Sequence, residues 1–160
     1  MPRWNKGSEA IERLLDTRQL EHGPADVDTV ARLLASARRH IDSAAMTAAV
    51  DPEGAFTLAY DACRKTATAL LAHQGLRPTS AGGHIVVVDT INAQLPGVPG
   101  LKSIDRLRRR RRRRNQAEYP DPQDYDPVTT EEVEDAIDAA QACVSASERQ
   151  FIAAPQLGVF

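Results

Sequence analysis

The stretch VDTVARLLASARRHIDSAAMTAAVDPEGAFTLAYDACRKTATALLAHQG runs from Val27 to Gly75 and predicts the centre of the fold. Apolar residues recur in it every three or four positions, the spacing of one face of an amphipathic helix. The first apolar face comprises Val27, Val30, Leu34, Ala37, Ile41, Ala44 and Ala48. The second comprises Phe56, Ala59, Cys63, Ala67 and Leu70. Asp51 and Pro52, a cap and a first-turn residue, separate the two faces with almost no loop, so the two predicted helices should pack antiparallel.

The residues before this pair predict a smaller helix, from Ser8 to about Leu20. Ser8 is a candidate N-cap, and His22-Gly23-Pro24 is typical of a helix end. The apolar face of this segment is short and comprises Ile11, Leu14 and Leu15. So small a face favours a helical arm over residues 1–24 rather than a part of the core.

The residues after the pair predict further helices. Residues 84–95 contain four consecutive β-branched residues, which alone are typical of a strand. No other segment alternates with period two to pair with such a strand, so we predict a buried helix there. Thr129 and Glu132 form a capping box for a last helix that runs to about Ser147. The fold class predicted is all-α: an antiparallel bundle of four to five helices over residues 25–150, followed by a tail at 151–160.

Length and composition place the chain among globular proteins. It has 160 residues, 26 % charged and 42 % hydrophobic, which fits one domain. No apolar run approaches the roughly 20 residues that cross a bilayer, and the N-terminus lacks the apolar core of a signal peptide. We therefore expect a cytoplasmic protein with no membrane contact. Cys63 and Cys143 are predicted to be reduced core residues, and no spaced His/Cys cluster predicts a metal site or a cofactor.

Positive charge is concentrated in LKSIDRLRRRRRRRNQAEY, Leu101 to Tyr119. This stretch holds eight of the 20 Lys+Arg residues between Arg106 and Arg114, which leaves 12 bases against 21 acids elsewhere once Asp105 is set aside. Adjacent like charges repel, so the run costs stability unless a partner neutralises it. The arginine side chain matches phosphate oxygens, and in a helix the run wraps most of the circumference. The predicted nucleic-acid-binding residues are Arg106, Arg108, Arg109, Arg110, Arg111, Arg112, Arg113 and Arg114.

The end of this stretch resembles a known family. Arg114-Asn115, followed a turn later by Glu118 and Tyr119, resembles the motif near the end of the fourth helix of the HEPN domain (higher eukaryotes and prokaryotes nucleotide-binding). The segment AYDACRKTATALLAHQGLRPTSAGGH, Ala59 to His84, is similar to the second-helix and turn region of a bacterial HEPN branch. The resemblance covers roughly residues 26–147.

The resemblance implies a HEPN-like bundle that forms a homodimer with a shared RNA-binding cleft. In active members this cleft cuts RNA without a metal, and many such proteins are toxins paired with a nucleotidyltransferase-type antitoxin. The motif arginine binds the scissile phosphate, and a histidine moves the proton. By position the implied catalytic residues are Arg114, Asn115, Glu118 and Tyr119. Tyr119 replaces the histidine and, with an ordinary pKa near 10, is a poor base at neutral pH, which leaves Glu118 as the other proton acceptor.

Three interpretations of the arginine run stay open at this point. The first is an RNA-binding dimer that, if active, is a metal-independent endoribonuclease. The second is a non-catalytic helical adaptor that docks on nucleic acid or on an acidic protein partner. The third is a basic helix whose charge is neutralised internally by the acidic last helix.

Overall fold

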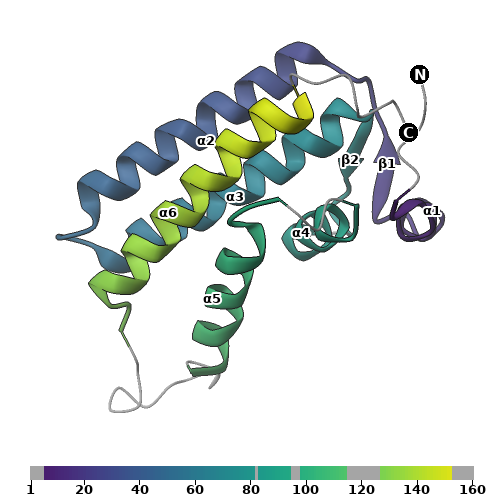
Figure 1. Cartoon of the computed structure of the whole chain (residues 1–160). Coiled ribbons are helices and arrows are strands. Elements are labelled where there is room, and N and C mark those ends of the chain that lie inside the picture. The colour runs from purple at the N-terminus through teal and green to yellow at the C-terminus, as the bar shows by residue number, and fades with distance from the viewer. Residues whose placement is uncertain (1–5, 82, 95–97, 115–126, 153–160) are drawn as a thin grey trace.

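The computed structural model describes residues 6–81, 83–94, 98–114 and 127–152, and nearly all of its regular structure is helical (Figure 1). The α-helices are α1 (Ser8–Asp16), α2 (Val27–Thr47), α3 (Pro52–His73), α4 (Gly83–Gln94), α5 (Leu101–Arg114) and α6 (Thr130–Ala146). A π-helical segment, Ser147–Ile152, follows α6, and two short strands are β1 (Leu20–His22) and β2 (Leu76–Pro78). The predicted all-α class is confirmed, and five of these α-helices fall between residues 25 and 150 as expected.

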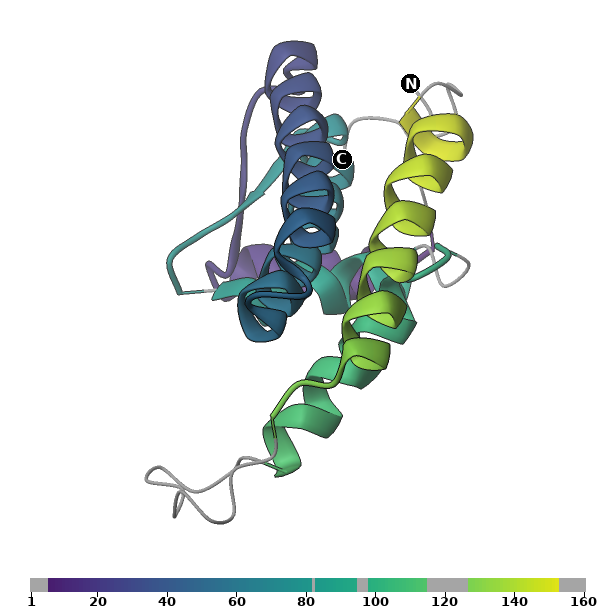
Figure 2. The ribbon, with the colours of Figure 1, turned by 90° about the vertical axis from the view of Figure 1, so that its left-hand side faces the viewer.

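The antiparallel pair α2 and α3 is the centre of the bundle, and α6 packs along both (Figures 1 and 2). Asp26 caps α2 by accepting hydrogen bonds from the backbone N–H groups of Asp28 and Thr29, at 3.0 and 3.2 Å. Asp51 caps α3 by accepting from Gly54 N at 2.9 Å. The predicted face of α3 is fully buried, and that of α2 is buried from Val30 to Ala44, whereas Val27 at the first position is 79 % exposed.

Helix α6 begins at the capping box that the sequence predicted. Glu132 N donates to Thr129 Oγ1 at 3.1 Å, and Thr129 N donates to the Glu132 carboxylate at 3.1 Å. Cys143 of α6 meets Cys63 of α3 in the core, and both are free thiols as predicted. Their mutual hydrogen bond and burial together raise the pKa of Cys63.

The N-terminal segment differs from the prediction. Gly7, in the left-handed region with φ 75°, is the N-cap of α1 in place of Ser8. The helix ends at Asp16, four residues before the predicted end, because Arg18 adopts a left-handed φ of 57°. Ile11 and Leu20 are fully buried in the main core, so this segment adds to the core although its pattern favoured an arm.

The small sheet joins the segment after α1 to the segment after α3. Strand β1 pairs antiparallel with β2, with Leu20 opposite Pro78, Glu21 opposite Arg77 and His22 opposite Leu76. Arg77 Nε lies 2.8 Å from Glu21 Oε1 across the pair. Sequence periodicity could not predict strands of three residues, because alternation needs a longer run to be recognised.

Residues 83–94 form the helix that we predicted, α4, despite the β-branched run. Val87, Val88 and Ile91 are buried, which suits an apolar helix surrounded by other elements. Gln94 and Gln74, the C-cap of α3, exchange two buried hydrogen bonds, at 2.5 and 2.9 Å, and so fix α4 against the end of α3. None of the helices in the described residues has the length and apolar character that a bilayer span needs.

Candidate nucleic-acid interface

Helix α5 starts in contact with α6 because Gly100 has no side chain. A Cβ atom at Gly100 would lie 1.9 Å from the carbonyl oxygen of Ala139 on α6, and its φ of 80° also favours glycine. The next residue, Leu101, is fully buried, and Leu107, six residues later, packs on the core. From there the C-terminal end of α5 points away from α2 and α3 (Figures 1 and 2).

The arginine run occupies the C-terminal half of α5, which ends at Arg114. The unpaired carbonyl groups at a helix C-terminus carry partial negative charge, and this charge favours cations. The helix end thus offsets part of the repulsion between neighbouring arginines, which is one reason that this sequence can remain helical.

Arg108 is held between α5 and α3. Its Nη2 lies 3.1 Å from Asp105 Oδ1, and its guanidinium carbon lies 5.5 Å from the centre of the Tyr60 ring, the geometry of a cation–π contact. The side chains of Arg108 and Asp105 are only 20 % and 13 % exposed. Burial raises the pKa of Tyr60, although the positive charge of Arg108 acts in the opposite direction, so the phenol is neutral at pH 7.

Arg109 links α5 to α4. Its Nε donates to Asp105 Oδ2 at 2.8 Å, and its Nη2 donates to Asp89 Oδ1 of α4 at 3.3 Å. The hydrogen bond to Asp105 raises the pKa of Arg109. Arg108 and Arg109 therefore use part of their hydrogen-bonding capacity to fix the direction of α5.

Arg106 has a different environment. It is exposed and forms no ion pair within the described part of the chain. With Leu107 it lines a groove of about 480 Å³ between α5 and α6, whose other wall includes Asp135 and Asp138. Asp135 and Asp138 of α6 thus share this groove with Arg106 but form no direct ion pair with it in the described structure.

The implied catalytic residues lie at the edge of the described structure or beyond it. Arg114 is the last residue of α5, while Asn115, Glu118 and Tyr119 lie outside the described residues. The side chains of Arg110–Arg114 are also outside them. The catalytic arrangement that the HEPN resemblance implies stays a prediction.

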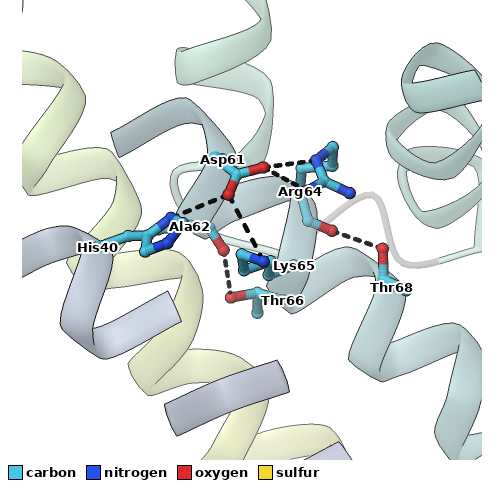
Figure 3. A network of polar contacts seen from close by, with 7 residues as sticks. All are labelled: His40, Asp61, Ala62, Arg64, Lys65, Thr66 and Thr68. Atoms are coloured by element: carbon cyan, nitrogen blue, oxygen red, sulfur yellow. Dashed lines mark hydrogen bonds and ion pairs between the residues drawn. The ribbon is translucent and has the colours of Figure 1, made fainter. Parts of the chain in front are cut away.

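A second polar cluster, which sequence analysis did not find, lies between α2 and α3 (Figure 3). Arg64 Nε donates to Asp61 Oδ1 at 2.7 Å, and His40 Nδ1 lies 2.9 Å from Asp61 Oδ2, although these two are not aligned for a hydrogen bond. Lys65 Nζ lies 3.7 Å from the same carboxylate. Burial acts to raise the pKa of Asp61, but the hydrogen bond and charge of Arg64, with Lys65 and His40, lower it overall.

The spacing of Asp61, Arg64 and Lys65 was a usable signal, because residues three and four apart share a helix face. His40 carried no such signal. Its partner Asp61 is 21 residues away and is brought near only by the packing of α2 on α3.

Comparisons with known proteins add no relative. Searches of protein-family models, of curated proteins and of solved structures found no match to this chain. Within the residues that the structure describes, no three His, Cys, Asp or Glu side chains are grouped so that they could hold a metal ion.

Proposed function

We propose that this protein binds RNA as a HEPN-like homodimer through α5. The observation that carries the proposal is the different use of the arginines along this helix. Arg108 and Arg109 are paired with Asp105 and Asp89, whereas Arg106 is exposed and without an ion pair in the described structure. Arg108 and Arg109 fix the direction of α5, and five more arginines, Arg110–Arg114, follow them in the same helix. The positive charge of the run is therefore carried by a helix that is held in place.

RNA suits this support for two reasons. The phosphodiester backbone is a continuous line of acceptor oxygens, and the arginine side chain is a planar group of five donors. Each phosphate contact also releases condensed counterions, which gives affinity without requiring a particular base sequence. A helix held in place before binding loses less conformational freedom on binding than a disordered basic segment would.

As a further part of the proposal, the dimer is a metal-independent endoribonuclease of the toxin–antitoxin type, with a nucleotidyltransferase-type partner. Arg114 would stabilise the charge that develops on the scissile phosphate, with Asn115 beside it. Tyr119 or Glu118 would assist proton transfer. These roles come from the family resemblance.

Binding is tested by titrating a fluorescent single-stranded RNA with the wild-type protein at several salt concentrations. The test variant has four arginines replaced by glutamine: Arg110, Arg111, Arg112 and Arg113. It leaves Arg108 and Arg109 in place, so α5 keeps its ion pairs. The slope of log affinity against log salt should become shallower by about 0.7 for each phosphate that the variant no longer neutralises.

The matched control removes the same number of charges elsewhere, by replacing four exposed arginines with glutamine: Arg13, Arg18, Arg32 and Arg39. For the control, the slope of log affinity against log salt should differ from that of the wild type only by the small effect of the lower net charge. Equal slopes for the wild type and the α5 variant, or equal losses of affinity in the α5 variant and the control, would refute binding through α5.

Cleavage is tested with the same RNA and purified protein. If the wild type cuts, Arg114→Ala should slow cleavage by about 100-fold or more, the usual scale for removing one group that stabilises transition-state charge. RNA binding should change little, because the other arginines remain. Tyr119→His should increase cleavage, since histidine is the better proton-transfer group at pH 7. Inert wild-type, Tyr119→His and Arg114→Ala proteins would end the ribonuclease proposal and leave binding alone.

A further inference from the structure

Helix α3 is buried along most of its surface, except for one stripe. Between Ala59 and Ala72 the residues that escape full burial include Tyr60, Asp61, Arg64, Lys65 and Thr68. These positions follow one another at helical spacing and form a partly open line on the central helix. The line is polar, and three of its five side chains are charged at pH 7.

Positive groups outnumber negative ones along this stripe. Asp61 is the one carboxylate on it, and it is shared by Arg64, Lys65 and His40 of α2 (Figure 3). The Lys65 ammonium, at 3.7 Å, is within ion-pair range of Asp61 but beyond hydrogen-bond distance. Its three donors therefore have no close protein acceptor among the described residues, although its side chain is only 21 % exposed.

The same stripe is short of hydrogen-bond acceptors at its Tyr60 end, where Arg108 lies. Arg108 Nε is a buried donor without a hydrogen-bond acceptor in the described structure, and His40 Nδ1, which lies 2.9 Å from Asp61 Oδ2, is a buried nitrogen without an aligned partner there. Buried donors in folded proteins nearly always have a partner, from the protein, from water or from a ligand. A surplus of donors and of positive charge is suited to a ligand that offers only acceptors and carries negative charge.

The stripe is continuous with α5. Arg108 lies over the Tyr60 ring, and Arg64, four residues further along α3, shares a face of that helix with Tyr60. Tyr60 thus lies between an arginine of α5 and an arginine of α3. A chain of phosphates that leaves α5 at Arg108 would next meet Arg64 and Lys65.

We infer that the RNA bound by α5 continues across Tyr60 onto α3, where Arg64 and Lys65 contact its phosphate backbone. This inference rests on the proposed function and extends the interface from one helix to two. Arg64 and Lys65 are then binding residues, and Asp61 is the carboxylate with which the RNA phosphates compete for them.

The test uses the full chain, a fluorescent single-stranded RNA and two kinds of variant with opposite expected effects. Lys65→Gln removes a loosely paired charge and should weaken RNA binding, and the double variant with Arg64→Gln should weaken it further. In each variant the slope of log affinity against log salt should become shallower by about 0.7 for each phosphate left without its cation. Asp61→Asn frees Arg64 and Lys65 from their carboxylate, so it should tighten binding. Circular dichroism confirms that each variant is folded, and Lys65→Gln alone carries the test if another variant unfolds.

The control is Arg32→Gln with Arg39→Gln, which removes two exposed charges from α2. If the α5 variant weakens binding while the α3 variants and the control all match the wild type, the extension onto α3 is wrong and binding through α5 stands. If the α5 variant binds as the wild type does, the proposed function itself fails. Weaker binding by Lys65→Gln than by the control, with tighter binding by Asp61→Asn, supports the inference.

Discussion

Asp105 lies beneath two arginines of α5 and accepts a hydrogen bond from each, although its side chain is only 13 % exposed. A partly buried carboxylate is costly unless it is paired, and so is the partly buried Arg108 that faces it. The ion pair itself adds little to the free energy of unfolding, because its attraction is offset by the cost of removing both charges from water. Removal of one member, however, leaves the other as a partly buried charge without a partner.

We therefore expect Asp105→Asn to lower the free energy of unfolding by about 1–3 kcal/mol, the cost of an unsatisfied charged group. Asp89→Asn is the matched control, because Asp89 binds Arg109 in a pair whose side chains are about half exposed. Its replacement should cost at most about 1 kcal/mol. Urea unfolding of the two variants measures the difference, and equal costs would contradict the role given to Asp105.

His73, near the end of α3, links stability to pH. Burial lowers its pKa, because the partly covered imidazole resists taking a charge. The unfolded chain therefore binds this proton at a higher pH than the folded chain does, so the free energy of unfolding should fall as the pH drops from about 7 to about 5. His73→Gln should flatten this part of the stability curve, as measured by urea unfolding at several pH values. An unchanged curve would show that His73 does not contribute.

Asp61, whose pKa is lowered, affects stability only at more acid pH, below about 4.

The helices differ in how far the sequence could predict them. The caps at Asp51 and Thr129 and the buried faces of α3 and α6 were predictable, because their partners lie within one or two turns of the same helix. The Gln74–Gln94 pair, the contact of Gly100 with Ala139 and the approach of His40 to Asp61 were not. Each joins two elements, so it depends on the packing that the sequence pattern alone does not specify.

Gly100 sets the start of α5, and its replacement tests that placement. Gly100→Ala should destabilise the protein by more than about 1 kcal/mol, because alanine is disfavoured at this φ and its Cβ meets the backbone of α6. Gly83→Ala is the control, since Gly83 also has a positive φ but nothing lies within 4 Å of its added Cβ. Thermal unfolding should show the larger destabilisation for Gly100→Ala. The reverse order would mean that α5 is not held by α6 at this position.

For the molecule as a whole, charge separation is the property that the proposal uses. The chain has a formal net charge of −2, yet eight of its 20 basic side chains lie between Arg106 and Arg114 of one helix. If RNA binds as proposed, the excess of acidic side chains on the rest of the chain would favour its contact with that helix and the adjoining stripe of α3. The fold class and the basic helix were both predictable from the sequence, whereas the ion pair of Arg109 with Asp89 was not, because it joins α5 to α4.

The proposed dimer is a property of the molecule that solution measurements can test. Light scattering at micromolar concentration should give twice the chain mass of 17.5 kDa. The mass should stay the same after replacement of Arg110–Arg113 by glutamine if the dimer is held by apolar contacts, and it should change if arginines take part in the interface. A monomer throughout this range would contradict a cleft shared between two copies.

The most direct test of the central claim is to locate the RNA on the protein. Single-stranded RNA containing a photoreactive base is crosslinked to the full chain, and the attached peptides are identified by mass spectrometry after cleavage at aspartate. We predict crosslinks in the peptide that begins at Asp105 and carries the arginine run, and their disappearance when salt is raised. Crosslinks confined to α1 or α2, or none at any salt concentration, would contradict RNA binding through α5.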